Sequence, residues 1–162
     1  MPVRDHREFF DLAAQAAHHK REMVLWPVLW RKYNGRKTLR WKHLVFRKIS
    51  RKKVPTRPGV YAFLVKPSLA NLNVAYPMYI GKATKSLRTR FGAYLTREKD
   101  PYKGRPKMAT LLHQYEGYLH FCFATLVSSS TVSRTEKKLI SAFKPPVNDE
   151  IEADVRRVTA AF

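Results

Sequence analysis

The chain has 162 residues, enough for one domain with a hydrophobic core and too few for two full domains. Hydrophobic residues make up 44% and aromatic residues 12%, which excludes disorder as a description of the whole chain. The 32 Lys and Arg face only 12 Asp and Glu, giving a formal net charge of +20. A compact domain with this charge repels itself, so we expect a polyanionic partner, with nucleic acid ahead of an anionic membrane surface.

The residue usage indicates a soluble protein of a reducing compartment, the cytoplasm. The single cysteine, Cys122, cannot form an internal disulfide, and its neighbours Phe121 and Phe123 predict a buried position. The first ten residues carry charges where a signal peptide has an apolar run. No stretch approaches the roughly eighteen apolar residues of a membrane span, so we expect no membrane partner.

The N-terminal part predicts a basic extension. Residues 5–25 have apolar positions at helical spacing, and Pro27 is expected to end that helix. A basic stretch over residues 31–53 follows, within which residues 38–49 favour a strand. We expect residues 1–56 to form a helical and irregular arm that binds nucleic acid. Its predicted phosphate-binding residues are Arg36, Lys37, Arg40, Lys42, Arg47, Lys48, Arg51, Lys52 and Lys53.

The remainder of the chain predicts strands and helices in mixed order. Strands are expected over residues 59–65, 78–81 and 119–127, with a loop over residues 67–77. Helices are expected over residues 86–97, 108–115 and 134–143, the last stopped by a Pro-Pro pair, and again in the tail from residue 149. This order predicts an α+β fold, with a small, mainly antiparallel three-stranded sheet flanked by helices behind the basic extension.

Acidic residues are scarce, so those in structured positions are the candidates for chemistry. Glu136 lies one turn into the last predicted helix. A two-metal site needs several carboxylates close together, and the only cluster, Asp149, Glu150 and Glu152, follows the Pro-Pro stop. The six histidines lack the spacing of zinc ligands. The sequence therefore disfavours a two-metal nuclease and allows a site with one carboxylate.

Three segments, PGVYAFLV, MYIGKATKSLRTRFGAYL and RTEKKLISAFKPPVND, resemble the GIY-YIG nuclease superfamily in order, identity and spacing. The first tyrosine motif ends at Tyr61, and the second begins at Tyr79 and is followed by Lys82. Arg90 stands in the place of the family arginine and Glu136 in that of the metal-binding glutamate. Five elements in the family's order make this a specific match.

The resemblance also assigns the C-terminal end of the motif and the extent of the domain. Asn148 stands in the place of the family asparagine and would orient the site by hydrogen bonds. The match covers roughly residues 57–149, which we expect to be the nuclease core. Residues 150–162 would then form a C-terminal helical tail.

Two intervals depart from the family pattern. The interval between the tyrosine motifs is longer than in compact members, and we place the excess in a hairpin loop over residues 66–77. The stretch before the arginine is also longer, so Arg88 competes with Arg90. We favour Arg90 because it precedes Phe91 and lies one turn before Tyr94. Arg88 is then a surface residue, and both it and Tyr94 are predicted to contact the nucleic acid.

The resemblance implies a metal-dependent DNA endonuclease with one Mg²⁺ or Mn²⁺ per active site, held by Glu136. Arg90 would clamp a phosphate oxygen with its planar guanidinium group. A tyrosine would deprotonate the attacking water, helped by the charge of Lys82, because a free tyrosine has a pKa near 10. Tyr61 and Tyr79 are both candidates for this base.

The biological setting follows less directly from the resemblance. Double-stranded DNA is the expected substrate, and a phage-type or restriction-type enzyme is the expected subclass, because the chain adds a basic arm but no second large domain. A non-catalytic nucleic-acid-binding module that keeps the fold is one alternative, although it predicts the loss of at least one site residue. A DNA-degrading toxin is another, and a homo-oligomer that cuts both strands is left open.

Overall fold

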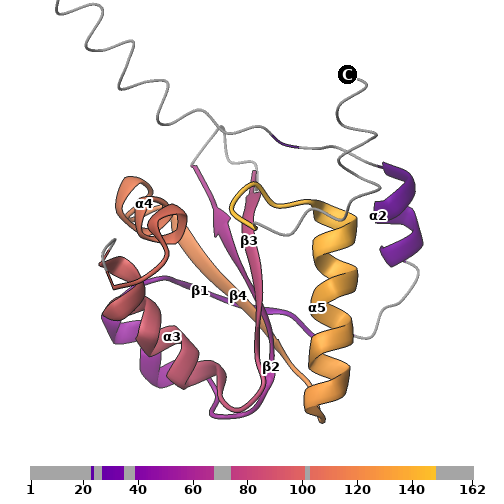
Figure 1. Ribbon diagram of the computed structural model, residues 1–162, viewed down its shortest axis with the longest axis horizontal. Coiled ribbons are helices and arrows are strands. Elements are labelled where there is room, and N and C mark those ends of the chain that lie inside the picture. Colours follow the sequence, from indigo (N-terminus) through magenta and orange to yellow (C-terminus); the bar gives the residue numbers. More distant parts are fainter. Residues whose placement is uncertain (1–22, 24–26, 35–38, 68–73, 101–102, 149–162) are drawn as a thin grey trace, which may run out of the picture.

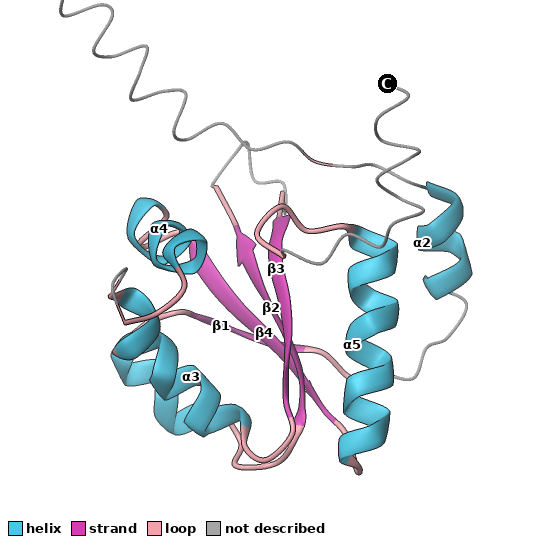
Figure 2. Cartoon of the chain, viewed as in Figure 1, coloured by secondary structure: helices cyan, strands magenta, loops and turns pink. Residues whose placement is uncertain are grey.

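A computed structural model describes residues 23, 27–34, 39–67, 74–100 and 103–148 of the chain. Within these ranges the strands are β1 (Lys42–Val45), β2 (Gly59–Val65), β3 (Tyr76–Ala83) and β4 (Leu119–Thr125). The helices are α2 (Pro27–Asn34), α3 (Leu87–Leu95), α4 (Pro106–Gln114) and α5 (Ser129–Phe143), with short 3-10 helices η1 (Lys48–Lys53) and η2 (Arg97–Lys99). Figure 2 shows the strands as one sheet between helices, so the fold is α+β, as the sequence predicts.

The sheet has one strand more than the three expected. Its four strands are antiparallel to their neighbours and run in the order β1-β4-β2-β3. The added strand, β1, comes from the predicted basic arm, where Lys42 pairs with Phe123 and Val45 with His120. β1 is short and lies at an edge with no buried residue, so it lacks the apolar alternation that reveals a strand in sequence.

Most other elements lie where the sequence predicts them. β2 coincides with the predicted strand and is almost wholly buried, because it lies between β4 and β3. β2 and β3 form the expected hairpin. α5 begins earlier than predicted because Ser128 caps it, its hydroxyl accepting a hydrogen bond from the Thr131 amide. Pro27 begins α2, a position that suits proline because the first turn needs no amide donor. The helix predicted over residues 5–25 and the tail from residue 149 lie outside the described residues.

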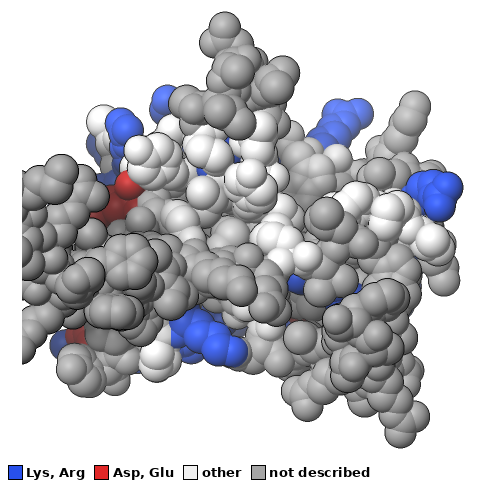
Figure 3. Space-filling view, turned by 90° about the horizontal axis from the view of Figure 1, so that it is seen from above, with Lys and Arg blue, Asp and Glu red and all other residues white. Residues whose placement is uncertain are grey.

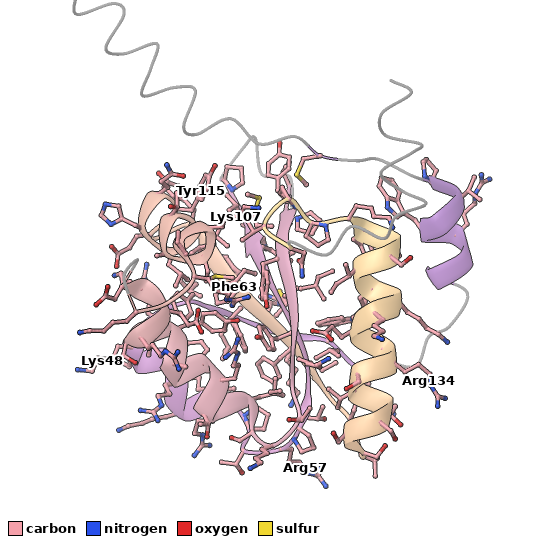
Figure 4. All side chains as sticks on the ribbon, viewed as in Figure 1. Lys48, Arg57, Phe63, Lys107, Tyr115 and Arg134 are labelled. Carbon is pink, nitrogen blue, oxygen red and sulfur yellow. The ribbon has the colours of Figure 1, made fainter. Side chains whose placement is uncertain are left out.

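The sheet separates two helical layers (Figure 1). Helices α3 and α4 cover one face and α5 covers the other, with α2 packed against α5. Alternation along β2 sends Tyr61 and Phe63 into an aromatic core beneath α3, whereas Val60 and Ala62 face α5. Figure 4 shows Phe63 in the space between α3, α4 and the sheet. No described helix has the length and apolar character needed to cross a membrane.

The end of α5 brings the chain back to the free edge of β3. Lys144 adopts a left-handed conformation with φ 45° and ends the helix, and the following Pro-Pro pair prevents its continuation. The amide of Val147 then donates to the carbonyl of Met78 at 3.0 Å. This contact places the residue after it, Asn148, beside the middle of β3.

Candidate active site

Buried tyrosine hydroxyls meet beneath α3. The hydroxyls of Tyr61 and Tyr94 lie 2.7 Å apart, and Arg90 Nε donates to the Tyr61 oxygen at 3.0 Å. Tyr61 and Tyr94 are fully buried, whereas Tyr79 retains 7% exposure. Burial, and then the neighbouring Tyr94 and Tyr79 hydroxyls, raise the pKa of Tyr61 well above its ordinary value. Burial raises the pKa of Tyr94 as well, so both hydroxyls stay protonated at neutral pH.

Gly81 leaves the space in which two of these rings lie. A Cβ atom at this position would come within 2.5 Å of the Tyr61 hydroxyl oxygen and 2.8 Å of Tyr79 Cε1. Both distances are far below van der Waals contact, so any side chain here would displace the tyrosines. The glycine of the second motif is therefore explained by the packing of the tyrosines over the strand.

Arg105 and Glu98 complete this cluster, and neither was predicted from the sequence as a site residue. Arg105 Nη1 donates to the Tyr79 hydroxyl at 3.0 Å and Nη2 to the Tyr94 hydroxyl at 3.2 Å. The Glu98 carboxylate contacts Arg105 Nε at 3.2 Å and Arg90 Nη1 at 3.7 Å, with its side chain 10% exposed. Glu98 lies in the short helix η2, and Arg105 lies in the Pro/Gly/Lys-rich stretch before α4, so neither belongs to a periodic segment. The only available signal was an acid in an acid-poor chain.

The two competing arginines of α3 have different partners. Arg90 points to the Tyr61 hydroxyl, with its guanidinium carbon 5.0 Å from the centre of the Tyr94 ring. Arg88 instead donates from Nε to the Val54 carbonyl at 2.7 Å and from Nη2 to the Lys52 carbonyl at 3.2 Å. Arg90 thus belongs to the tyrosine cluster, and Arg88 does not. The predicted contact of Arg88 with nucleic acid stays a prediction, and these carbonyls occupy two of its donors.

A second pair of charged groups lies on the other face of the sheet. Lys82 follows Gly81 on β3, and alternation directs it toward α5 with Val60 and Ile80. Lys82 Nζ contacts Glu136 Oε2 at 2.7 Å, and the two side chains are 38% and 14% exposed. β3 is an edge strand of the described sheet. Tyr79 therefore supplies its side chain to the tyrosine cluster and Lys82 to the ion pair with Glu136, and no other strand of that sheet lies between β3 and solvent.

Asn148 is bound to the backbone of the same strand. Its side-chain Oδ1 accepts from the Ile80 amide at 2.9 Å, and its Nδ2 donates to the Ile80 carbonyl at 2.8 Å. This two-point contact satisfies the edge of β3 as a neighbouring strand would. Asn148 therefore fixes the strand segment that carries Tyr79 and Lys82, which fits the orienting role implied by the resemblance.

The predicted phosphate-binding residues lie on the surface where they are described. Arg36 and Lys37 fall outside the described residues. The others are all exposed: Arg40, Lys42, Arg47, Lys48, Arg51, Lys52 and Lys53. Figure 3 shows lysine and arginine side chains at several separate places around one view of the surface and few acidic ones. Their contact with nucleic acid stays a prediction.

The residues present fit a single hard cation held by one carboxylate. Among the described residues, no group of three or more His, Cys, Asp and Glu could hold a metal ion. Mg²⁺ needs no such group, since one or two carboxylates, several waters and substrate phosphates satisfy it. Glu98 has an arginine on each of its oxygens. Glu136 has only Oε2 in its ion pair with Lys82, so it is the better candidate to hold a metal.

A comparison with solved structures finds similar domains. The chain is similar to the GIY-YIG N-terminal endonuclease domain of UvrC from Thermotoga maritima, in a tyrosine-to-phenylalanine mutant bound to the catalytic divalent cation. The identity is 24% and the TM-score 0.44, over 64% of this chain and 99% of that one. The magnesium-bound form of that domain gives 26% identity and a TM-score of 0.43, over 63% and 98%.

No family model and no curated protein matches the chain. The function proposed next rests on the geometry of the site.

Proposed function

We propose that the chain is an endonuclease of the GIY-YIG type, which hydrolyses DNA phosphodiester bonds with the help of one divalent cation. The arrangement around β3 supports this most directly. Tyr79 and its arginine partner lie on one side of the strand, and the Lys82–Glu136 pair lies on the other. A phosphodiester along this edge would meet a proton acceptor, cationic donors and a carboxylate, which are the groups that its hydrolysis needs.

Tyr79 is the better candidate for the group that takes the proton from the attacking water. Tyr61 is fully buried, bonded to the hydroxyl of Tyr94, and its pKa is raised by burial, so it can neither reach a water nor lose its proton at neutral pH. Tyr79 retains 7% exposure, and its hydroxyl accepts a hydrogen bond from Arg105 at 3.0 Å. Tyr61 and Tyr94 then hold Arg90 and Arg105 in place.

Arg90 is the cation proposed to bind the reacting phosphate. Its Nε is taken by Tyr61, and its side chain is 34% exposed, which leaves terminal donors toward solvent. A planar guanidinium fixed in this way can hold a non-bridging oxygen without reorganising as charge develops. Glu98 restrains both arginines, and its own charge is balanced by them.

Glu136 would hold the metal ion, with Lys82 beside it. When bound, the ion would supply positive charge to the phosphate and to the leaving oxygen. Lys82 occupies Oε2 of the carboxylate, so Oε1 is the oxygen left for a metal. Lys82 keeps its position through β3, whose register is fixed on one side by β2 and on the other by Asn148.

DNA is the proposed substrate because of the charge of the chain, and a phage-type or restriction-type enzyme is the proposed subclass. The net charge of +20 favours a polyanionic partner. The exposed lysines and arginines of residues 40–53 come shortly before the proposed nuclease core in the sequence. Such enzymes cut at defined positions, whereas a DNA-degrading toxin needs no sequence preference.

Cleavage of supercoiled plasmid DNA tests the proposal. The wild-type protein should convert the plasmid to nicked and linear forms with Mg²⁺ and leave it intact with EDTA. Discrete fragments would support the restriction or phage type, and a continuous smear would favour a toxin. Tight DNA binding without cleavage under any divalent cation would overturn the enzymatic proposal in favour of a binding module.

A further inference from the structure

A cavity of about 570 Å³ lies on the far side of α3 from the tyrosine cluster. Its rim carries four cations, Arg47, Lys48, Arg51 and Lys99, and one acid, Glu116. Its floor is apolar, formed by Phe46, Leu95, Leu112 and Leu119. Figure 4 shows Lys48 at this outer flank of the molecule, beside α3 and away from α5. The chemical step proposed above uses none of these residues, although Arg47, Lys48 and Arg51 are among the cations proposed to bind DNA.

The backbone at the end of η1 is hydrogen-bonded to α3. Arg88 Nε donates to the Val54 carbonyl and Nη2 to the Lys52 carbonyl, while the Arg88 amide donates to the Pro55 carbonyl at 2.9 Å. Three donors of one helical residue thus bind the end of η1. The backbone that carries the cations is therefore already in place before a ligand binds, which lowers the entropic cost of binding.

Gly92 provides the position for one of these cations. A Cβ atom at residue 92 would lie 3.0 Å from Arg51 Nε and 3.1 Å from its Cζ, so the guanidinium of Arg51 rests against the bare helix backbone. Glycine inside a helix costs about 1 kcal/mol relative to alanine. The close approach of Arg51 gives a reason for this glycine, and it fixes a cation at the mouth of the cavity.

We propose that this cavity binds a segment of the DNA strand as it leaves the active site, with phosphates on the cationic rim and a sugar or base on the apolar floor. Cations bind phosphates, and an apolar surface at their centre suits the uncharged parts of a nucleotide. Lys99 pairs with Glu116 at 2.9 Å, so the only acid of the rim is already neutralised. The cavity volume lies within the roughly 300–1,000 Å³ of small-ligand sites.

The position of the cavity agrees with a continuous path for one strand. Arg90 and Gly92 are two residues apart, so they lie on nearly opposite sides of α3. A helix with its side chains is about 10–12 Å across, and phosphates of one strand advance by about 3.4 Å along the axis. The cavity would therefore receive the strand about three nucleotides from the bond that is cut.

Binding of a short DNA duplex to the Glu136→Ala protein in EDTA tests the inference without cleavage. The inference rests on the proposed function only for the identity of the ligand. If the protein binds DNA through the cavity but never cuts, the nuclease proposal fails alone. If it cuts but the cavity variants bind normally, the cavity proposal fails alone.

The cavity variant is Arg47→Ala with Arg51→Ala, and its control is Arg134→Ala with Lys138→Ala, two exposed cations of α5. Both pairs remove two exposed positive charges, but only the residues of the first pair line the cavity. The slope of log K against log salt changes by about 0.9 for each phosphate contact. We expect the cavity variant to lower that slope by about two and the control by less than one. Equal effects of the two pairs would overturn the proposal.

Gly92→Ala tests the same site without removing a charge. The added methyl should displace Arg51, whose flexible end can move, while the gain in helix propensity keeps the protein at least as stable. We expect weaker DNA binding with an unchanged or higher unfolding temperature. Wild-type affinity in this variant would contradict the proposed role of Arg51.

Two competitors of equal charge separate a nucleotide site from a simple anion site. An oligothymidylate should displace the duplex at lower concentration than inorganic polyphosphate, because only the former has groups for the apolar floor. Equal competition would overturn the assignment of a nucleotide to the cavity.

Discussion

At the scale of single residues, Arg88 and Arg90 are neighbours with different partners. Arg90 contacts the tyrosine cluster, whereas Arg88 contacts backbone carbonyls at the end of η1. Arg90→Ala should lower the single-turnover rate of DNA cleavage by about 100- to 1,000-fold, because a donor to the developing charge is lost. Arg88→Ala should instead lower the free energy of unfolding by about 1–2 kcal/mol in a urea titration. The opposite pattern would show that the arginine of the site is Arg88.

Tyr79 and Tyr61 should also respond differently to substitution. Tyr79→Phe should lower the cleavage rate by about 100-fold or more if Tyr79 takes the proton. Tyr61→Phe should act mainly on stability, because its buried hydroxyl only holds Arg90 and Tyr94. The measurement is cleavage rate and unfolding free energy on both variants. A larger loss of rate for Tyr61→Phe would contradict the assignment of Tyr79 as the base.

At the scale of elements, the edge of β3 is stabilised by one side chain. Asn148→Ala leaves the Ile80 amide and carbonyl without their partner, which should cost about 1–3 kcal/mol of unfolding free energy. Asn148→Asp should cost more, because its carboxylate still accepts from the amide but repels the Ile80 carbonyl. Hydrogen exchange of the Ile80 amide should accelerate in both variants. Unchanged exchange would show that the edge is held by other contacts.

The elements also show what sequence can and cannot predict. β2 was predictable because a central strand is apolar along its length, and Tyr61, Gly81 and Asn148 were found through motif spacing. β1 lies within residues 38–49, which favour a strand, but it was not counted in the predicted sheet because an exposed edge strand has no apolar alternation. Arg105 and Glu98 were missed because their role arises from the folding of the α3–α4 connection over Tyr79 and Tyr94, which local sequence does not encode.

At the scale of the whole molecule, the buried tyrosines predict how stability depends on pH. Burial raises the pKa of Tyr61 and of Tyr94 above the value of about 10 found in an unfolded chain. From about pH 10 upward the unfolded chain loses these protons while the folded protein keeps them. The stability that these two hydroxyls contribute is therefore fully present below about pH 10, and it is lost as the pH rises through their pKa values in the folded protein. Burial also raises the pKa of Cys122, to about 11, and acts in the same direction.

Urea titrations from pH 8 to 11 test this dependence. The wild type should lose stability more steeply above about pH 10 than Tyr61→Phe, because the variant has one fewer group whose pKa is raised by folding. Tyr118→Phe is the control, because Tyr118 is 56% exposed. Equal slopes for the wild type and Tyr61→Phe would contradict the proposed protonation of the cluster.

The most direct test of the nuclease proposal is metal-dependent cleavage by Glu136→Gln. The variant keeps the size of the side chain but removes the charge that would hold the ion. We predict single-turnover cleavage at least about 100-fold slower than the wild type at saturating Mg²⁺. Asp100→Asn, which changes an acid paired with Lys103 outside the proposed site and cavity, should cut at the wild-type rate. Cleavage by Glu136→Gln as fast as by the wild type would contradict the account.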